Sequence, residues 1–472
     1  MHTTTTGMNV SLARTIAALD RLVECAQSFN GLFPSVLEID TGKMPFILPP
    51  AIDGQRDCDR SFPGSNLMHD HIVLGLMYDL TGATGEPRFA EAADRYLQWF
   101  AIHCTDTPTG LFPWGEHAFW SLYEGRPGSS YPLARVATMA THDHLHQAPV
   151  WLWEKLWAFN HLAVDRFCLG LTRHYFDMDP PEYNRHTNLL QHYMKRVRND
   201  GSCDFPRHGG LWMLDWCFTY ARTGSPTFRQ YIGRTLDYWW DKRTPGQVLP
   251  LASRPKPAQG PMPQAAQTIS LAVSLLESAV LVEPRDPELA ATMRQRGNAY
   301  LDAVLAAPHD LDHGRFAGRL ADSRSGEAVY SPSWGSRYGT SNSPSACFAL
   351  LALCAYRLNH DARLLDMAER IGRCCAVDEI PAGVAVPVKD AGMQLGLLTD
   401  LYSITGDRQW LDHAERWSRV LLPIFLDRDL PRAAIGSGIY ESQCLPGYFL
   451  RGLARTALLA EGKDIGPDYT LR

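Results

Sequence analysis

Residues 66–82 read NLMHDHIVLGLMYDLTG, and after the short break ATGEP the chain continues as RFAEAADRYLQWF at 88–100. Apolar residues in the first segment, such as Leu67, Ile72 and Leu76, recur at helical spacing around nearly the whole circumference. The second segment has one apolar and one polar face. This pattern predicts an inner helix buried between layers, followed by an outer helix that faces solvent. The glycine in the break suits an antiparallel hairpin, because glycine readily takes the left-handed C-cap conformation.

The same helical unit recurs along the chain. Candidate inner helices begin near residues 66, 147, 208, 262, 343, 390 and 441, which gives about seven hairpins, with six as the alternative count. One looser copy pairs an inner helix near 147 with an outer helix at 181–197, PEYNRHTNLLQHYMKRV. The first helix, at 11–29, has no preceding partner and the last, at 441–460, has no following one, so these two would close a ring. We therefore predict an all-α, single-domain (α/α) toroid over residues 1–472, with an open α-solenoid as the alternative.

The links between helices are of two kinds. Links within hairpins are short, whereas those that enter the inner helices are long and rich in Gly, Pro, Trp and His. Inner helices of a toroid run parallel, so their entry loops meet at one end, where the helix N-termini add partial positive charge. We predict the functional cleft at this end of the ring.

Composition excludes several classes of function. The chain has 472 residues, 45% hydrophobic content and a net charge of −6, and it contains no long basic run, so we expect a large core and no nucleic-acid partner. It has no apolar signal core and no run that predicts a membrane span. We expect a cytoplasmic protein as written, or a periplasmic or secreted one if a signal peptide has been removed. The eleven cysteines are scattered and predict reduced, mostly buried thiols. The oligomeric state stays open.

The densest group of aromatic and titratable residues lies between 109–120, TGLFPWGEHAFW, and 141–149, THDHLHQAP. Aromatic rings stack on the apolar faces of sugars, while carboxyl and imidazole groups transfer protons. The pattern therefore indicates a saccharide site, although buried tryptophans and capping histidines are the alternative interpretation. The predicted substrate-binding residues are Trp114, Glu116, His117, Trp120, His69, Asp143, Trp334 and Tyr440.

A second group lies in SPSWGSRYGTSNSP at 331–344. The Arg337 guanidinium could bind a carboxylate bidentately, and a nearby cation favours the tyrosinate form of Tyr338. The alternative is an arginine that stabilises a turn beside a core tyrosine. The predicted catalytic residues are Tyr338, Arg337, His142, His144 and His208.

Alternating histidines at 142, 144 and 146 also permit a metal site, with His69 and His71 as further ligands. Histidines that act without a metal are the preferred interpretation, so we predict no metal and no cofactor. Asp215, in the middle of the apolar LWMLDWCF, is either functional or part of a hydrogen-bond network. The sequence contains no Walker, Rossmann, HExxH or GxSxG motif.

Paired helices with a rim rich in Trp, His and Tyr resemble the α/α-toroid carbohydrate-active enzymes. About seven hairpins without an added β-domain look most like polysaccharide lyase family 38, the glucuronan and alginate lyases. The resemblance covers nearly the whole chain as architecture, and its motifs do not align residue by residue. It implies β-elimination at a 4-linked uronate of an acidic polysaccharide or oligosaccharide. Tyr338 or a histidine would be the base, and Arg337 with His117, His142 or His144 would neutralise the carboxylate.

Unsaturated glucuronyl hydrolases, which resemble the same kind of toroid with six hairpins, provide the alternative. The protein would then be a glycoside hydrolase that acts on uronic-acid-containing oligosaccharides through Glu116 and Asp143, and the separation of the two carboxyl groups would indicate the stereochemistry. A sugar 2-epimerase and a non-catalytic helical scaffold are further alternatives.

Overall fold

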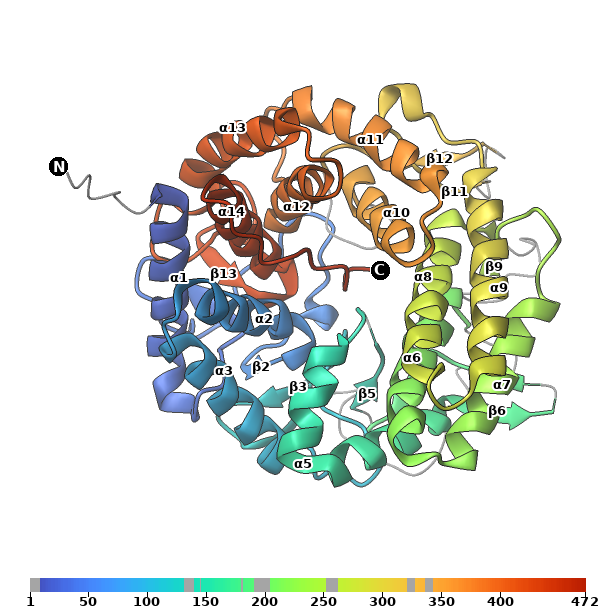
Figure 1. Cartoon of the computed structure of the whole chain (residues 1–472). Helices are drawn as coiled ribbons and strands as arrows, with labels where there is room; N and C mark the ends of the chain where they lie inside the picture. The colour runs from blue at the N-terminus through green and yellow to red at the C-terminus, as the bar shows by residue number, and fades with distance from the viewer. Residues whose placement is uncertain are drawn as a thin grey trace.

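Two concentric layers of helices make up the computed structural model of the chain, which describes residues 9–130, 140–144, 146–179, 181–190, 204–251, 262–320, 327–335 and 343–472. The inner layer surrounds the ring axis (Figure 1). Its helices begin within a few residues of the predicted positions, because segments that are apolar all round can be buried on every side. The inner helices are α2 (Leu67–Thr84), α5 (Val150–Leu171), α6 (Pro206–Thr223), α8 (Ala265–Val282), α10 (Ser345–Asn359), α12 (Val388–Thr405) and α14 (Pro446–Ala460).

The outer helices each bury one face against the inner layer. In α3, for example, Phe89, Ala93 and Leu97 are buried, while the polar residues between them face outwards. The first helix, α1, packs against α14 and so closes the ring. The α/α toroid predicted from the sequence is therefore confirmed. The outer helices are α1 (Val10–Ala26), α3 (Arg88–Trp99), α7 (Pro226–Asp241), α9 (Pro287–Leu305), α11 (Ala362–Val377) and α13 (Arg408–Phe425).

One predicted hairpin is wrong in its second half. The stretch 181–190, expected to begin an outer helix, instead contains β7 (Pro181–Tyr183) and β8 (Thr187–Asn188). β7 pairs with β6 (Tyr175–Met178), and β8 pairs with β5 (Thr141–His142). A local hairpin with β6 and a pairing with the distant β5 override the weak helical periodicity of this stretch. α5 thus has no outer partner within the described ranges, and it bends at Asn160, where φ is −158° and ψ is 83°.

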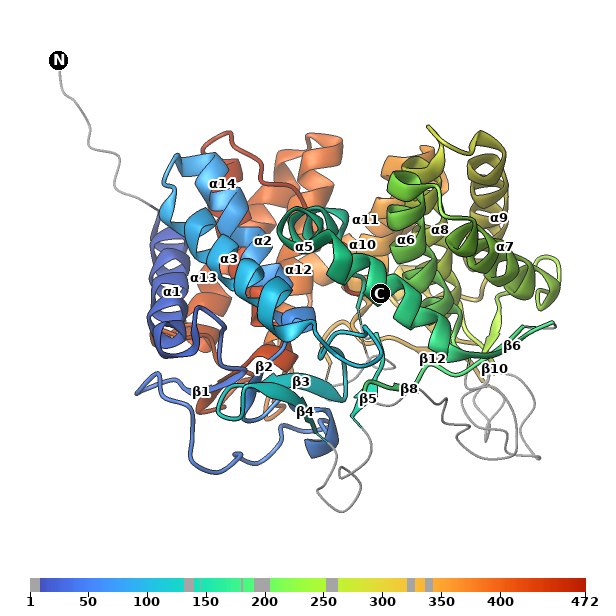
Figure 2. The same cartoon turned by 90° about the horizontal axis from the view of Figure 1, so that it is seen from below.

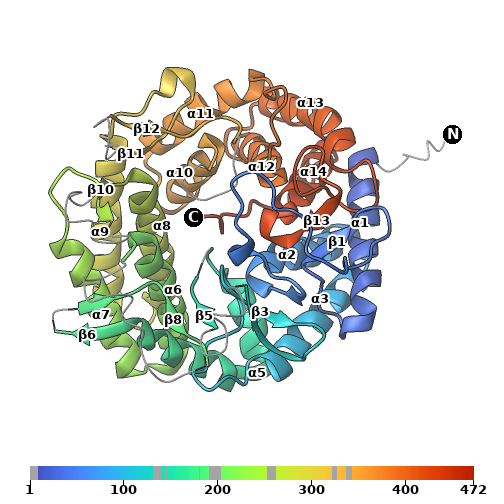
Figure 3. The same cartoon turned by 180° about the vertical axis from the view of Figure 1, so that it is seen from behind.

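Short antiparallel strands gather at one end of the ring, below the helices in Figure 2. Figure 3 shows the molecule from behind, with β1, β13, β3 and β5 in view. This is the end at which the inner helices begin, as the long entry loops predict. The remaining strands are β1 (Val36–Glu38) with β13 (Ile439–Glu441), β2 (Gly64–Ser65) with β3 (Ala118–Ser121) and β4 (Arg126–Ser129), β9 (Pro250–Leu251) with β10 (Met262–Pro263), and β11 (Ala317–Arg319) with β12 (Val329–Tyr330).

Among the described helices, α8 alone is long and apolar enough to cross a membrane by length and composition. It is an inner helix, 78% buried inside the ring. Its contacts with α6, α9 and α10 account for its apolar circumference. The cysteines in the described part of the chain are unpaired and mostly buried, as the sequence predicts.

Candidate active site

The two motifs of the 109–149 region meet at the loop end of the ring. Asn66, the N-cap of α2, donates from Nδ2 to the carbonyl oxygen of Gly115 at 2.8 Å. Gly115 has φ +99°, and a Cβ there would lie 1.9 Å from the carbonyl oxygen of Asp143. Only glycine therefore permits this close approach of the two loops. As a result, the main-chain N–H of Glu116 donates to Asp143 Oδ1 at 3.0 Å.

Glu116 and Asp143 form a carboxyl pair that shares one guanidinium. Arg185 Nη1 lies 3.0 Å from Glu116 Oε2 and 3.1 Å from Asp143 Oδ2. Burial and the neighbouring Glu116 carboxylate raise the pKa of Asp143 to about 7. For Glu116, burial opposes ionisation, but Arg185 and His117 outweigh it and hold the pKa well below its usual range. Near neutral pH, Glu116 is therefore ionised while Asp143 exchanges a proton.

Two histidines complete a compact group with the carboxyl pair. His117 Nδ1 lies 2.9 Å from the carbonyl oxygen of Cys58, and its Nε2 lies 3.4 Å from Glu116 Oε2. His186 Nε2 lies 3.9 Å from Asp143 Oδ2. One ligand atom from each of the four residues lies within 4.8 Å of the others, so the set could hold a divalent cation. The Arg185 guanidinium already compensates both carboxylates, which lowers the gain from binding a second cation there.

Four other imidazoles, His69, His144, His146 and His208, form what we call the histidine cluster. All four are buried, and among the described residues none of their eight ring nitrogens has a hydrogen-bond partner. The rings of His69 and His146 lie 6.3 Å apart. Burial lowers the pKa of His69 and His144 to about 3 and that of His146 and His208 well below its usual range. Each neutral ring thus offers one donor and one acceptor, as a sugar hydroxyl does.

Cationic groups lie beside the histidine cluster. Burial lowers the pKa of His208 most, and the charges of Arg207 and Arg185 lower it further. The charges of Arg207 and Lys389 also lower the pKa of His146. Burial lowers the pKa of Arg207 only to about 10, so it stays protonated at neutral pH. Within the described ranges, its Nε has no hydrogen-bond partner. A buried guanidinium of this kind suits a carboxylate ligand.

Several predicted site residues instead support the core. Trp114 is fully buried among Phe112, Trp153 and Phe167, so its faces are covered and cannot stack on a sugar. Its Nε1 donates to His142 Nε2 at 3.2 Å. His142 Nδ1 lies 3.0 Å from His174 Nε2, so both of its ring nitrogens are bonded to the protein. These positions correct the sequence-based roles of Trp114 and His142, because neither has a face or atom left for substrate.

Other predicted residues lie in the walls of the loop end. Tyr440 is buried in β13, opposite Leu37 of β1. Trp334 is 5% exposed and packs 5.2 Å from Trp417 of the outer helix α13. Trp120 is half-buried in β3. Substrate contact by these three residues stays a prediction.

Asp215 and His71 are tied into hydrogen-bond networks. Asp215 Oδ1 accepts from Trp153 Nε1 at 2.8 Å, and its Oδ2 lies 3.6 Å from His144 Nε2. His71 uses both ring nitrogens, at 2.9 Å from the carbonyl oxygen of Met68 and 3.0 Å from Thr470 Oγ1. The predicted catalytic pair Arg337 and Tyr338 lies outside the described residues, so its role stays a prediction.

The sequence interpretation overlooked Arg185 and His186 because it assigned 181–197 to an outer helix. A signal was present in NRHTN at 184–188, where two basic residues stand between two asparagines, which favour turns over helix. Arg56, which contacts Glu116 Oε1 at 2.6 Å, was overlooked in the long Pro-rich loop. Lys389, in the stretch AVPVKDAG at 385–392 that leads into α12, was not among the predicted site residues.

No protein family matches the sequence, and no curated protein matches it. Among solved structures, the α-1,6-mannanase GH76A of Salegentibacter sp. HEL1_6 is 12% identical, with a TM-score of 0.46 over 95% of this chain and 99% of that one. The unsaturated glucuronyl hydrolase of Bacillus sp. GL1 is 13% identical, with a TM-score of 0.45 over 94% and 96%. A sugar epimerase from a ruminal bacterium is 11% identical, with a TM-score of 0.48 over 79% and 88%. The polysaccharide lyases that the sequence resembles are not among these three, and similarity at this level carries no conclusion about activity.

Proposed function

We propose that this protein is a glycoside hydrolase that acts on uronic-acid-containing saccharides, with Asp143 as the proton donor. The observation that carries the proposal is the carboxyl pair, in which one guanidinium contacts both groups and the two pKa values shift in opposite directions. Titratable neighbours whose pKa values are pushed apart are typical of acid and base assignments in catalytic sites. The glycoside hydrolase, which was the alternative function from the sequence, thus replaces the polysaccharide lyase as the proposed function.

The acid step follows from the protonation state of the pair. With a pKa of about 7, Asp143 holds its proton in a substantial fraction of molecules near neutral pH and can donate it to the substrate. Glu116 stays negative and stabilises the positive charge that develops on the sugar ring. Arg185 holds both carboxyl groups in place.

The separation of the two carboxyl groups narrows the reaction. One oxygen of each group lies within 4.8 Å of the other, whereas the carboxyl groups of inverting glycosidases stand roughly 6.5–9.5 Å apart to leave room for a water molecule. Because one guanidinium nitrogen contacts both groups, we take the pair to act as one acid/base unit on one side of the substrate. An unsaturated uronate needs only one such unit. Asp143 would protonate the enol-ether double bond, and water would add to the resulting cation at C5 and return a proton to Asp143. The C5 hemiketal would then open to a ketone and leave a hemiacetal at C1, whose breakdown to the aldehyde releases the partner sugar as an alcohol.

The substrate class follows from the groups beside the pair. The neutral imidazoles of the histidine cluster match hydroxyl groups, and the guanidinium of Arg207 matches a carboxylate. A buried site that combines unpaired neutral donors with a cation suits a polyhydroxylated acid better than a neutral sugar. The carbohydrate substrates of the mannanase and glucuronyl hydrolase toroids agree with this class only in general terms.

An ultraviolet and reducing-end assay tests the proposal. The protein is incubated with saturated uronate oligosaccharides and with their unsaturated counterparts, which absorb through the C4–C5 double bond. A fall in ultraviolet absorbance with the unsaturated oligosaccharides supports the hydrolase. So do new reducing ends from the saturated oligosaccharides when the absorbance does not rise. A rise in absorbance would establish β-elimination and return the assignment to the lyase. No change on either set, with neutral oligosaccharides cleaved, would refute the acidic substrate.

A further inference from the structure

The last residues of the chain enter the centre of the ring. Figure 1 shows the C-terminus at the ring axis, surrounded by the inner helices. Thr470, Leu471 and Arg472 are 5%, 5% and 7% exposed. Residues 469–472, which we call the tail, thus consist of the half-buried Tyr469 followed by three buried residues.

On one side, the tail contacts residues next to the histidine cluster. The main-chain N–H of Gln147, which follows His146, donates to the carbonyl oxygen of Thr470 at 3.0 Å. Arg207, which precedes His208, donates from Nη1 to the main-chain oxygen of Arg472 at 2.9 Å. The tail thus lies directly beneath the group of buried, unpaired side chains.

Further contacts join the tail to the surrounding helices. The hydroxyl oxygens of Tyr448 in α14 and of Thr470 form a hydrogen bond at 2.8 Å. Cys347 of α10 donates from Sγ to the carbonyl oxygen of Leu471 at 3.6 Å. On α8, Arg472 binds Ser274 Oγ at 2.9 Å and Glu277 Oε2 at 2.5 Å. Contacts with opposite sides of the ring hold the tail across the axis.

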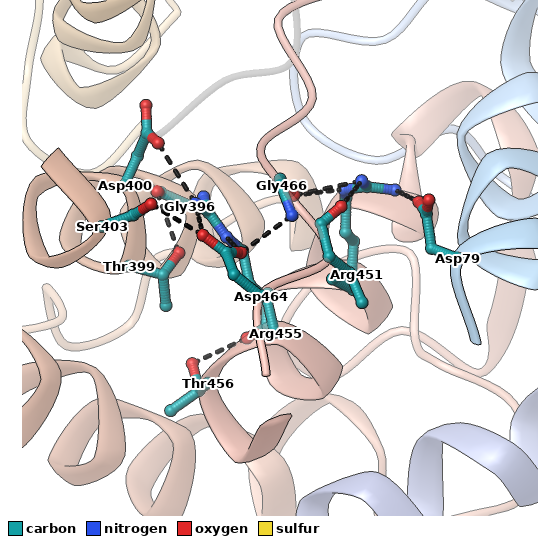
Figure 4. A network of polar contacts seen from close by, with 12 residues as sticks. Asp79, Gly396, Thr399, Asp400, Ser403, Arg451, Arg455, Thr456, Asp464 and Gly466 are labelled. Atoms are coloured by element: carbon teal, nitrogen blue, oxygen red, sulfur yellow. Dashed lines mark hydrogen bonds and ion pairs between the residues drawn. The ribbon is translucent and has the colours of Figure 1, made fainter. Parts of the chain in front are cut away.

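The segment that leads into the tail is fixed by a buried polar network (Figure 4). Arg455 donates from Nε to Asp464 Oδ1 at 2.8 Å and from Nη2 to Asp400 Oδ1 at 3.2 Å. Arg451 pairs with Asp79 Oδ2 at 2.6 Å and also donates from Nη2 to the carbonyl oxygen of Gly466 at 3.1 Å. This network sets the direction in which the chain enters the ring.

A separate pocket lies on the other side of the tail. It has a volume of about 810 Å³ and is lined by Tyr469, Thr470 and Arg472 together with Tyr78 and Trp151. Tyr78 lies nine residues beyond His69 on α2, or about 13 Å further along the helix at 1.5 Å per residue. The tail forms part of the wall of this pocket, which we call the far pocket and which also reaches Gln147, the residue next to His146.

We propose that the tail is the floor of the saccharide site and restricts the enzyme to the ends of saccharide chains. The inference rests on the proposed function and adds the mode of action to it. Because the histidine cluster belongs to the first turns of α2 and α6 and to the loop before α5, a sugar that reaches it enters along the axis. The tail blocks the axis below, so a chain cannot pass through and must insert with one end first.

The product pattern of the intact protein tests this inference. A saturated, end-labelled uronate octasaccharide is sampled from the first few per cent of conversion, because an unsaturated unit stands only at a chain end and would be released from there with or without a floor. Release of only the terminal unit and the shortened chain supports the floor. Internal fragments from the first samples would overturn it while leaving the hydrolase proposal intact. If no saccharide of any length is cleaved, the proposed function fails and this inference fails with it.

Opening the floor provides a second test. In Thr470→Gly/Leu471→Gly/Arg472→Gly, the tail side chains are removed, and we expect at least a tenfold loss of kcat/KM on the octasaccharide. Cys347, 2% exposed beneath Leu471, should become reactive towards a thiol reagent. If the variant does not fold by circular dichroism, Arg472→Met is used, with Lys463→Met outside the ring as the matched control. An opened variant with a reactive Cys347 but unchanged kcat/KM and products would overturn the inference.

Discussion

Two polar regions of this ring differ in how their groups are satisfied. In the network around Arg451 and Arg455 (Figure 4), guanidinium nitrogens meet carboxylate or carbonyl oxygens, and of the two side chains only Nη1 of Arg455 lacks a partner. In the histidine cluster, none of the eight ring nitrogens has a hydrogen-bond partner among the described residues, although His144 Nε2 lies 3.6 Å from Asp215 Oδ2. Arg451, Arg455 and the four histidines are all buried, so the exposure of these side chains to water does not explain the difference.

The difference indicates which region serves stability and which serves binding. A buried polar group without a partner costs about 1–3 kcal/mol, so four such imidazoles weaken the fold considerably. A ligand whose hydroxyl and carboxylate groups pair with them would recover that free energy on binding. We therefore expect changes in the Arg455 network to alter stability and changes in the loop-end cluster to alter activity.

The largest effect is expected for Asp143→Asn. The amide keeps the shape of the carboxyl group but cannot donate a proton, so kcat should fall by about 10²–10⁴-fold. The measurement is the initial rate on the uronate substrate identified by the ultraviolet assay. Glu154→Gln is the matched control, because Glu154 lines the far pocket with its side chain 58% exposed, and its rate should stay within twofold of wild type. An unimpaired Asp143→Asn would remove this residue from catalysis.

Arg455→Met should cost about 1–3 kcal/mol of unfolding free energy, because it removes charge-assisted hydrogen bonds to the buried Asp400, which keeps its contact with Arg357, and to the exposed Asp464. Urea unfolding followed by circular dichroism gives the value. Arg363→Met, at an arginine whose side chain is 62% exposed, should cost less than about 1 kcal/mol. Equal losses in the two variants would contradict the assignment of the Arg455 network to stability.

Acid should destabilise the protein through the histidine cluster. The pKa of His69 and of His144 is about 3 in the folded chain, against about 6.5 when unfolded. The unfolded chain binds protons first, so their contribution to stability is present above pH 6.5 and is lost as the pH falls towards 3. At pH 5 each imidazole should cost about 2 kcal/mol. Asp143, whose raised pKa is about 7, acts in the opposite direction, since its contribution is lost as the pH rises through 7.

The measurement is the unfolding free energy at pH 7.5 and pH 5 for wild type and for His69→Gln/His144→Gln. The substitutions remove two titrating groups and leave the carboxyl groups in place, so the loss between the two pH values should shrink by about 4 kcal/mol. An identical loss in both proteins would mean that these imidazoles do not control the acid sensitivity.

The ring was predictable because its pattern is local and repeated. Helices that are apolar all round, such as the segment beginning at Leu67, alternate with amphipathic helices that have a single apolar face. This alternation alone predicts two layers. The meeting of the entry loops follows from the parallel inner helices. The one misassigned stretch, around Arg185, pairs its backbone with Thr141–His142, which lies more than forty residues earlier in the chain. Local periodicity contains no information about such pairing.

The site was predictable by region more than by role. The motif containing Glu116 and the motif containing Asp143 do meet at the loop end. The direction in which each side chain points was not predictable, because strict alternation in an extended segment would place His142 and His146 on the same side, whereas the strand here ends at His142. In the structure His142 pairs with Trp114 in the core, and the ring of His146 lies 6.3 Å from that of His69. Sequence spacing could not predict which of these two histidines lies in the core and which lies in the histidine cluster.

The smallest but most discriminating effect concerns His69 and its neighbour His71 on α2. His69→Leu replaces an unpaired buried imidazole with an apolar side chain, so stability should be unchanged or rise by about 1 kcal/mol while saccharide binding weakens. His71→Leu removes two hydrogen bonds and should cost about 1–3 kcal/mol. Thermal unfolding and substrate KM are measured for both variants. Because the two histidines are equally buried and two residues apart, only their hydrogen-bond partners differ. If both variants lost stability equally, unpaired nitrogens could not mark the binding site. If His71→Leu lost stability while His69→Leu gained it, the buried imidazoles without hydrogen-bond partners would mark the substrate contacts.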